Sequence, residues 1–200
     1  LGNSTPFDKS KPIEYYRVRY KYFQTELLLR KGFKNHVLDI SIGPAYYHYW
    51  NKFADNKSRI LGTPPFLIDS ASVYSNKNYL GGKLKIDVNF VNDELIPSRG
   101  VTWYNEFSSM AGLDSNSKSI TKFTSDMTVY ASLTEERKFV TVLRFGGGHS
   151  FSKKFEYFQA LNLGANNILR GFRKQRFSGS STLYASAEER IKLFKSESYI

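Results

Sequence analysis

The sequence has 200 residues, a formal net charge of +11, 14 Tyr, 16 Phe and a mean hydropathy of -0.44. This aromatic content excludes a disordered chain, and no apolar run approaches the roughly 20 residues that a membrane-spanning helix needs. The low hydropathy fits a soluble protein, and equally a membrane barrel, because barrel strands alternate lipid-facing with lumen-facing residues. The absence of cysteine excludes disulfides and thiolate metal sites. The chain starts at Leu1 without a secretory signal, so we expect a mature protein or an internal fragment.

Apolar and polar residues alternate with period two along much of the chain, which predicts strands. In the clearest run Leu84, Ile86 and Val88 alternate with Lys83, Lys85 and Asp87. The first run loses its alternation near Phe23, where we expect a β-bulge. No convincing helix is predicted, and about seven strands are, over Tyr15–Leu29, Val37–Tyr49, Tyr79–Val91, Gly100–Ser108, Ile120–Leu133, Lys138–Gly147 and Ser181–Leu193.

Strand length and connection length both favour a membrane barrel over a soluble sandwich. The predicted strands have roughly 10 to 15 residues, whereas a tilted strand crosses a bilayer with about 9 to 11. Short connections (30–36, 92–99 and 134–137) alternate with mostly longer ones (50–78, 112–119 and 148–180), as periplasmic turns alternate with external loops. Aromatic residues near strand ends are predicted to form interfacial girdles, namely Tyr46, Tyr47, Tyr49, Trp50, Tyr79 and Phe194.

Motifs for catalysis or metal binding are weak. The three histidines (His36, His48 and His149) lack the short spacings of zinc ligands. The run Gly146-Gly147-Gly148 follows a predicted strand without opening a helix, so it lacks the dipole of a phosphate loop, and we interpret it as a flexible strand end. Lysines and arginines share the polar parity with acidic residues, which indicates a water-filled lumen and no nucleic-acid platform. We expect no catalytic, cofactor-binding or metal-binding residues in this segment.

The most specific motif is Leu169-Arg170-Gly171-Phe172, with Gly164 before it and Glu188-Glu189-Arg190 after it. It resembles the loop signature of the bacterial surface-antigen barrel superfamily (BamA/TamA type), in particular Bacteroidota-like members. In that family a long external loop folds back into the barrel, and the next strand carries a Glu-x-Arg pattern. A second match, Pro97-Ser98-Arg99-Gly100, resembles a periplasmic turn of the family, and involves Pro97, Arg99 and Gly100.

The resemblance implies an all-β fold, in which residues 1–200 form part of one antiparallel transmembrane β-barrel of sixteen strands. Residues 148–180 would then be the inward-folding external loop. It further implies that Arg170 reaches into the lumen and pairs with Glu188. Parity supports that pairing independently, because Glu188 lies on the polar face of its strand and Glu189 on the lipid face.

The function implied is insertion of outer-membrane proteins, or polypeptide translocation, in the bacterial outer membrane and without a cofactor. The implied partners are lipid, lipopolysaccharide, client outer-membrane proteins and periplasmic or lipoprotein accessory subunits, with no nucleic acid. One alternative is a membrane anchor or export barrel for a fused phosphoesterase or patatin-like hydrolase outside this segment. Others are a passive pore, which a plugging loop disfavours, and a soluble binding sandwich.

Overall fold

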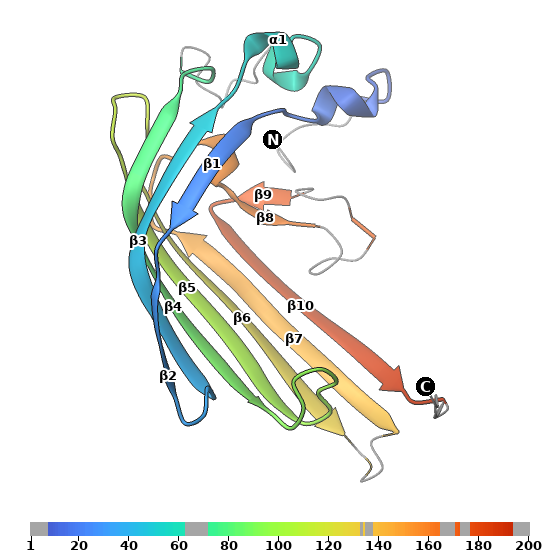
Figure 1. Ribbon diagram of the computed structural model, residues 1–200. Coiled ribbons are helices and arrows are strands. Elements are labelled where there is room, and N and C mark those ends of the chain that lie inside the picture. The colour runs from blue at the N-terminus through green and yellow to red at the C-terminus, as the bar shows by residue number, and fades with distance from the viewer. Residues whose placement is uncertain are drawn as a thin grey trace, which may run out of the picture.

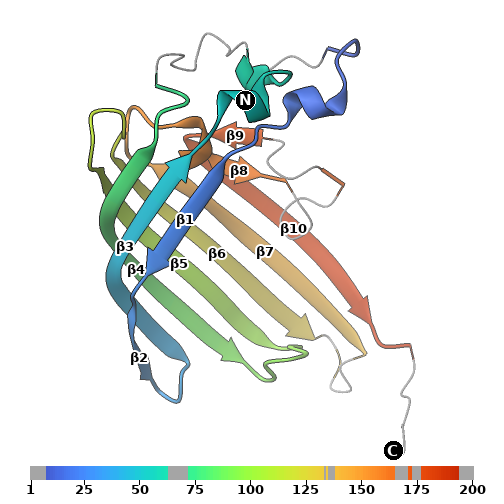
Figure 2. The same cartoon turned by 45° about the horizontal axis from the view of Figure 1, so that its top comes forward.

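A computed structural model describes residues 8–62, 72–132, 134, 138–164, 171–172 and 177–193. These residues form one strongly curved antiparallel sheet with the strand order β1-β3-β4-β5-β6-β7-β10, in which β2 also pairs with β3 (Figures 1 and 2). A separate hairpin, β8 and β9, lies on the concave side of the sheet. The sheet strands are β1 (Lys21–Glu26), β2 (Leu29–Phe33), β3 (Leu38–Trp50), β4 (Lys77–Val91), β5 (Gly100–Gly112), β6 (Ile120–Ser132), β7 (Phe139–Ser150) and β10 (Ser181–Ile191). The hairpin strands are β8 (Leu161–Leu163) and β9 (Phe177–Gly179).

The prediction of seven long strands is confirmed, because β1 and β2 are two parts of one interrupted strand. Both pair with β3, and the register runs on from Glu26 opposite Ala45 to Leu29 opposite Ile42. The interruption lies opposite Pro44, whose backbone has no N–H to donate. Pro44 still accepts a hydrogen bond from the amide of Leu27 at 3.1 Å. The other strands have 11 to 15 residues, which is enough to cross a bilayer.

The bulge predicted near Phe23 is wrong. Pairing is continuous through this residue, which lies opposite His48, and β1 keeps its register from end to end. The apolar–polar alternation breaks in the sequence because Tyr22 belongs to the concave face, where its ring stacks on that of Tyr49 with centroids 5.8 Å apart. An aromatic side chain at an inward position therefore imitates a change of register.

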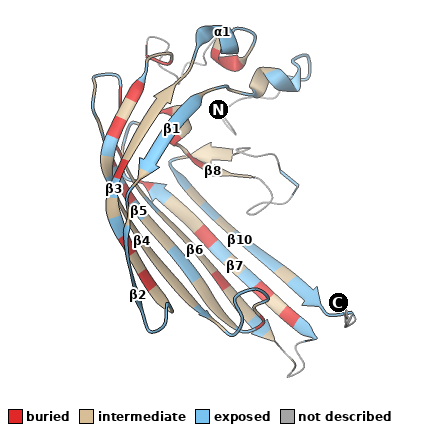
Figure 3. Cartoon of the chain, in the orientation of Figure 1, coloured by how far each residue is buried: buried red, intermediate tan, exposed pale blue. Residues whose placement is uncertain are grey.

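Each long strand presents one apolar and one polar face, as the alternation predicts. Outward side chains are mostly large and apolar, and several are at least half exposed, for example Ile42, Phe90 and Leu183. Inward positions carry the charged residues of β4 to β7 and are mostly buried or half-buried (Figure 3). This is the inside-out arrangement of a membrane barrel, with its apolar face toward lipid.

The small hydrophobic core lies at one end of the concave face. It consists of the buried residues Ala45, Tyr79, Met110 and Ile120, with Tyr47, Tyr49, Phe155 and Phe158 packed against them. The girdle prediction is therefore wrong for Tyr47, Tyr49 and Tyr79, which point inward. Their position near a strand end does not reveal which face they occupy, because that depends on parity. Tyr46 and Trp50 have the outward parity, and Phe194 lies outside the described residues.

Connection lengths mostly alternate, as predicted. The turns β2–β3, β4–β5 and β6–β7 gather at one end of the sheet, and the connections β3–β4, β5–β6 and β7–β10 gather at the other (Figure 1). The β3–β4 and β7–β10 connections are long, whereas the β5–β6 connection (113–119) is no longer than the β4–β5 turn (92–99). The described residues also contain four single helical turns: η2 (Ile13–Tyr16), α1 (Phe53–Asn56), η3 (Ile60–Gly62) and η4 (Tyr157–Gln159). Elements of one turn are too short to leave a periodic pattern in the sequence. No described helix has the length and apolar character to cross a membrane.

The three consecutive glycines also differ from the prediction. They belong to β7, which continues to Ser150, so the long connection to β10 starts at Phe151. Glycine has a low intrinsic preference for strands, so the sequence of this segment by itself does not predict one. Here the two neighbouring strands pair with all three glycines and hold the segment extended.

Candidate functional site

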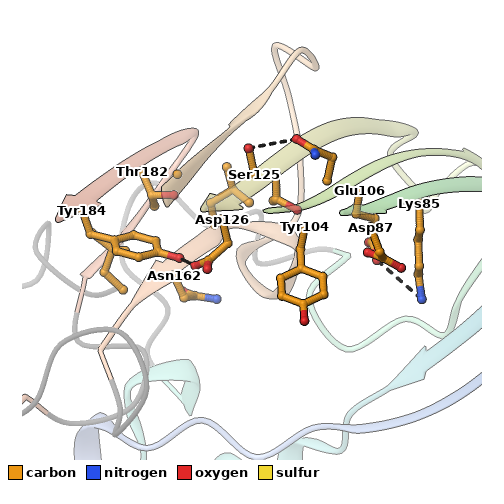
Figure 4. Close-up of a pocket in the computed structure, with 14 residues that line it drawn as sticks. Lys85, Asp87, Tyr104, Glu106, Ser125, Asp126, Asn162, Thr182 and Tyr184 are labelled. Carbon is orange, nitrogen blue, oxygen red and sulfur yellow. Dashed lines mark hydrogen bonds and ion pairs between the residues drawn. The ribbon is translucent and has the colours of Figure 1, made fainter. Parts of the chain in front are cut away.

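A half-open cavity of about 370 Å³ lies between the concave face of the sheet and the hairpin strand β8 (Figure 4). Five neighbouring strands of the sheet line the cavity, of which β4, β5, β6 and β10 contribute charged or aromatic side chains, and β8 contributes Leu161, Asn162 and Leu163. The residues labelled in Figure 4 are Lys85, Asp87, Tyr104, Glu106, Ser125, Asp126, Asn162, Thr182 and Tyr184. The cavity is thus a polar space inside the curve of the sheet, with part of the long connection as its cover.

On one side of the cavity, Asp126, Arg144 and Tyr184 join three strands. The guanidinium of Arg144 (β7) donates from Nε to both carboxylate oxygens of Asp126 (β6) at 2.9 Å, and its Nη2 lies 2.8 Å from Oδ2. Tyr184 (β10) donates from its hydroxyl to the same carboxylate. A guanidinium that grips a carboxylate through several donors fixes both side chains in orientation. The three residues therefore link β6, β7 and β10 through their side chains at the wall of the cavity.

On the other side, a ladder of alternating charges links β1, β4 and β5. Lys83 Nζ lies 2.7 Å from Glu26 Oε1 and 3.2 Å from Glu106 Oε1. Lys85 Nζ lies 3.4 Å from Glu26 and 3.8 Å from Glu106. The Tyr47 hydroxyl donates to Glu26 Oε1 at 2.9 Å. Two ammonium groups thus face two carboxylates, and the ladder carries no net charge.

The chemistry available at this wall is binding through many weak polar contacts. Its positive charges are already paired with carboxylates, which agrees with a mixed-charge lumen and argues against a nucleic-acid groove. Within the described part of the chain, no three His, Cys, Asp or Glu side chains group as metal ligands.

Of the predicted loop motif, Leu169 and Arg170 lie outside the described residues. Gly171 has a left-handed backbone, with φ at +85°. The Phe172 ring is half exposed and lies 5.4 Å from that of Phe177 in β9. Gly164, at the end of β8, also has a positive φ of +118°. Both glycines therefore lie where the chain needs backbone conformations that other residues adopt rarely.

Glu188, the predicted partner of Arg170, has the inward parity that the alternation implies. It lies opposite Val142 of β7, and its Oε1 accepts a hydrogen bond from Arg190 Nε at 2.8 Å. The guanidinium of Arg190 also lies over the Tyr130 ring, 5.8 Å from its centroid. Glu188 thus already has one cationic neighbour on its own strand, and Arg170 would be a second.

The predicted turn Pro97-Ser98-Arg99-Gly100 closes β4 onto β5. The side chain of Asn92 organises it, since its Oδ1 accepts hydrogen bonds from the amides of Ser98 and Arg99 at 3.1 and 2.8 Å. Gly100 has φ at +122°, and a β-carbon there would lie 2.0 Å from the carbonyl oxygen of Phe90. The glycine in this motif is therefore required by the backbone itself.

Sequence reasoning missed Arg144 as a functional residue. A usable signal existed: the short β6–β7 turn sets Thr128 opposite Arg144, which places Asp126 on the diagonal. No comparable signal could identify Tyr184, which reaches across an entire strand.

Comparisons with known proteins agree with this architecture. The model of the Omp85 superfamily domain matches residues 3–199. Among solved structures, the chain is similar to a crystal structure of BamA from Haemophilus ducreyi lacking POTRA domains 1-3, with a TM-score of 0.63 and 17% sequence identity over 90% of this chain and 39% of that one. No curated protein sequence is a significant match.

The structural likeness shows a shared fold, and this chain spans less than half of the BamA chain that it matches. The family match covers nearly the whole sequence. It agrees with the long antiparallel strands, the apolar outer face and the polar concave face. The chain therefore belongs to the Omp85 superfamily and is part of a barrel of the bacterial outer membrane.

Proposed function

We propose that the full-length protein inserts outer-membrane proteins or translocates a polypeptide through its barrel, with the long β7–β10 connection acting as a lumenal element. The observation that carries this proposal is the position of β8 against the polar inner wall, where it covers a cavity lined by paired charges. Because the charges of this wall are paired with one another, we infer that a passing chain would meet polar contacts without one strong binding site. The barrels of this family are not enzymes, so the wall is assigned a binding role.

The tip of the loop is the second part of the proposal. Arg170 would reach the lumenal carboxylate of Glu188 and share it with Arg190. Arginine suits this role because its planar fork keeps its charge and can hold a carboxylate through two donors. Gly171, with its left-handed backbone, supports a tight change of chain direction beside Arg170.

The partners proposed for the full-length protein are client outer-membrane proteins, periplasmic or lipoprotein accessory subunits, lipid and lipopolysaccharide. A plugged lumen disfavours the passive pore. The family match contradicts the soluble sandwich.

The proposal is tested by reconstituting the full-length protein in liposomes of outer-membrane lipids and adding an unfolded β-barrel client. Folding of the client is followed by its heat-modifiable gel migration. We expect faster folding than in empty liposomes, and the Arg170→Ala variant should lose most of this acceleration. Equal folding rates with and without the protein, together with no passage of an exported polypeptide, would overturn the proposed function.

A further inference from the structure

The β7–β10 connection is attached to the barrel at its base, a region distinct from the Arg170 tip. The base runs from Phe155 to Leu161, and includes η4. It lies at the end of the sheet where the β3–β4 and β5–β6 connections also lie, against the core that includes Ala45 and Tyr79.

A buried ion pair makes the first contact between the base and the sheet. Glu156 Oε1 lies 3.2 Å from Lys77 Nζ at the start of β4, and both side chains are almost fully buried, with exposed fractions of 7% and 2%. Lys118, in the β5–β6 connection, lies 3.6 Å from the same oxygen. Lys77 also donates to the carbonyl of Asn116 at 2.7 Å. Because the Lys77 ammonium is almost fully buried, loss of the Glu156 carboxylate would leave that charge uncompensated.

An aromatic stack makes the second contact. The Phe158 ring lies on that of Tyr49 with centroids 4.1 Å apart and planes 22° apart, and edge-on to Tyr79 at 6.4 Å. Offset stacks and edge contacts of this kind add to the free energy gained by burial of the rings. The neighbouring hydroxyl of Tyr157 accepts a hydrogen bond from Asn51 Nδ2 at 3.3 Å. The base is thus fixed to β3 and β4 through side chains alone.

Gln159 makes the third contact, and it is itself buried. Its Oε1 accepts from the amide of Glu156 at 2.8 Å, and its Nε2 donates to the carbonyl of Lys118 at 3.3 Å. Its own carbonyl accepts from Lys122 Nζ of β6 at 3.3 Å. The base therefore contacts strands and connections from β3 to β6, and none of these contacts involves the loop tip.

We propose that Glu156, Phe158 and Gln159 form a permanent anchor that positions the long loop in the lumen independently of its Arg170 tip. The base then holds the loop whether or not Arg170 pairs with Glu188. This inference deepens the proposed function, and rests on the lumenal placement of the loop assumed there. Glu156, Phe158 and Gln159 are positioning residues, since they act on the loop and not on a passing chain.

The test is segment-resolved hydrogen exchange on the full-length protein in lipid nanodiscs. In Glu156→Gln and Phe158→Ala, amides of residues 155–161 should exchange at least tenfold faster, with β4 to β6 unchanged. In Arg170→Ala the same amides should stay within twofold of the wild type. Lys153→Gln, an exposed substitution in the same loop, is the matched control. Equal release of residues 155–161 by Arg170→Ala, or continued protection in both anchor variants, would overturn the anchor.

Conservative and compensating variants keep the test decisive if an anchor variant fails to fold. Phe158→Tyr retains the stack and should retain protection, and the exchanged pair Lys77→Glu with Glu156→Lys should regain much of the protection that Lys77→Glu alone removes. Failure of both would count against the anchor. Client folding is measured on the same samples. If the variants show the expected exchange pattern but the protein does not accelerate client folding, the proposed function is contradicted and the anchor is supported.

Discussion

The hydroxyl of Tyr184 on β10 donates a hydrogen bond to the carboxylate of Asp126 on β6, across the whole width of the intervening strand β7. The Tyr184 ring lies over Gly146, where a β-carbon would come within 2.3 Å of the hydroxyl oxygen. Glu26 on β1 reaches Lys83 on β4 in the same manner, over β3 at the small residue Ala45. Small residues in the middle strand thus allow long polar side chains to connect next-nearest neighbours.

Gly146→Ala should displace Tyr184 and destabilise the barrel by about 1.5–3 kcal/mol, because a hydrogen bond to a charged acceptor is lost. Tyr184→Ala removes the ring that Gly146 accommodates, so adding Gly146→Ala to it should cost little more. Gly82→Ala is the matched control, since a β-carbon there meets its nearest atom at 3.6 Å. The measurement is the temperature at which heat-modifiable migration is lost. A full additive cost in the double variant would contradict the role of Gly146.

The two faces of β4 should respond oppositely to substitution. Ile86→Arg places a charge on the lipid face, and should cost about 2–4 kcal/mol near mid-strand. Lys85→Ser on the concave face should be milder, because Lys83 continues to neutralise Glu26 and Glu106. Val129→Arg and Thr128→Ser form the equivalent pair on β6. Urea unfolding in liposomes measures the unfolding free energy of the four variants. Equal losses for substitutions on both faces would refute the assigned orientation.

Gly100→Ala should destabilise the β4–β5 turn by about 1–3 kcal/mol, the usual cost of a forced backbone conformation. Both its positive φ and its approach to the Phe90 carbonyl oppose a β-carbon. Arg99→Ala should be nearly neutral, because Arg99 contributes to the turn through its backbone amide, which donates a hydrogen bond to Asn92 Oδ1. Unfolding free energies of the two variants give the comparison. If Arg99→Ala lowered the unfolding free energy more than Gly100→Ala, the turn would depend on the Arg99 side chain and not on the glycine backbone.

The β5–β6 connection should loosen at acid pH through Asp114. Burial raises the pKa of this carboxyl, but hydrogen bonds from Ser117 and Asn78 outweigh it and hold the pKa below its usual value. A carboxyl with a lowered folded pKa contributes stability at neutral pH that is lost as the pH falls through that pKa. Amide exchange of residues 113–119, corrected for its intrinsic pH dependence, should therefore show less protection at acid pH. Asp114→Asn should abolish this change, and an unaltered pH profile in that variant would count against it.

Loss of the proposed tip contact should expose the loop to protease. Arg170→Ala should speed chymotrypsin cleavage after Phe172 and Phe177, because Arg170 no longer holds the tip to Glu188. Arg170→Lys should restore little, since an ammonium lacks the planar fork. Glu188→Gln should have a partial effect. Its neighbour Glu189 faces outward, where its Oε1 accepts a hydrogen bond from the Thr141 hydroxyl at 2.8 Å, so Glu189→Gln is the control. Cleavage of Arg170→Ala at the wild-type rate would contradict the proposed contact between Arg170 and Glu188.

The sequence by itself determined the strands, their two faces and the alternation of short and long connections. These features follow from local rules: side chains alternate along any strand, and a turn joins residues that are close in the chain. Ile86 and Lys85 could therefore be placed on opposite faces from their positions alone. The family resemblance likewise rested on a contiguous motif around Arg170.

Only the tertiary structure decided which inward residues meet. The contact of Tyr184 with Asp126 depends on the register of two strand pairs at once, and an error of one residue in either would abolish it. The inward position of Tyr49 and its stack on Phe158 depend on where the long connection returns to the sheet. Strands β8 and β9 have three residues each, which is too few for a periodic pattern in the sequence. Their position on the concave side of the sheet is therefore visible only in the tertiary structure.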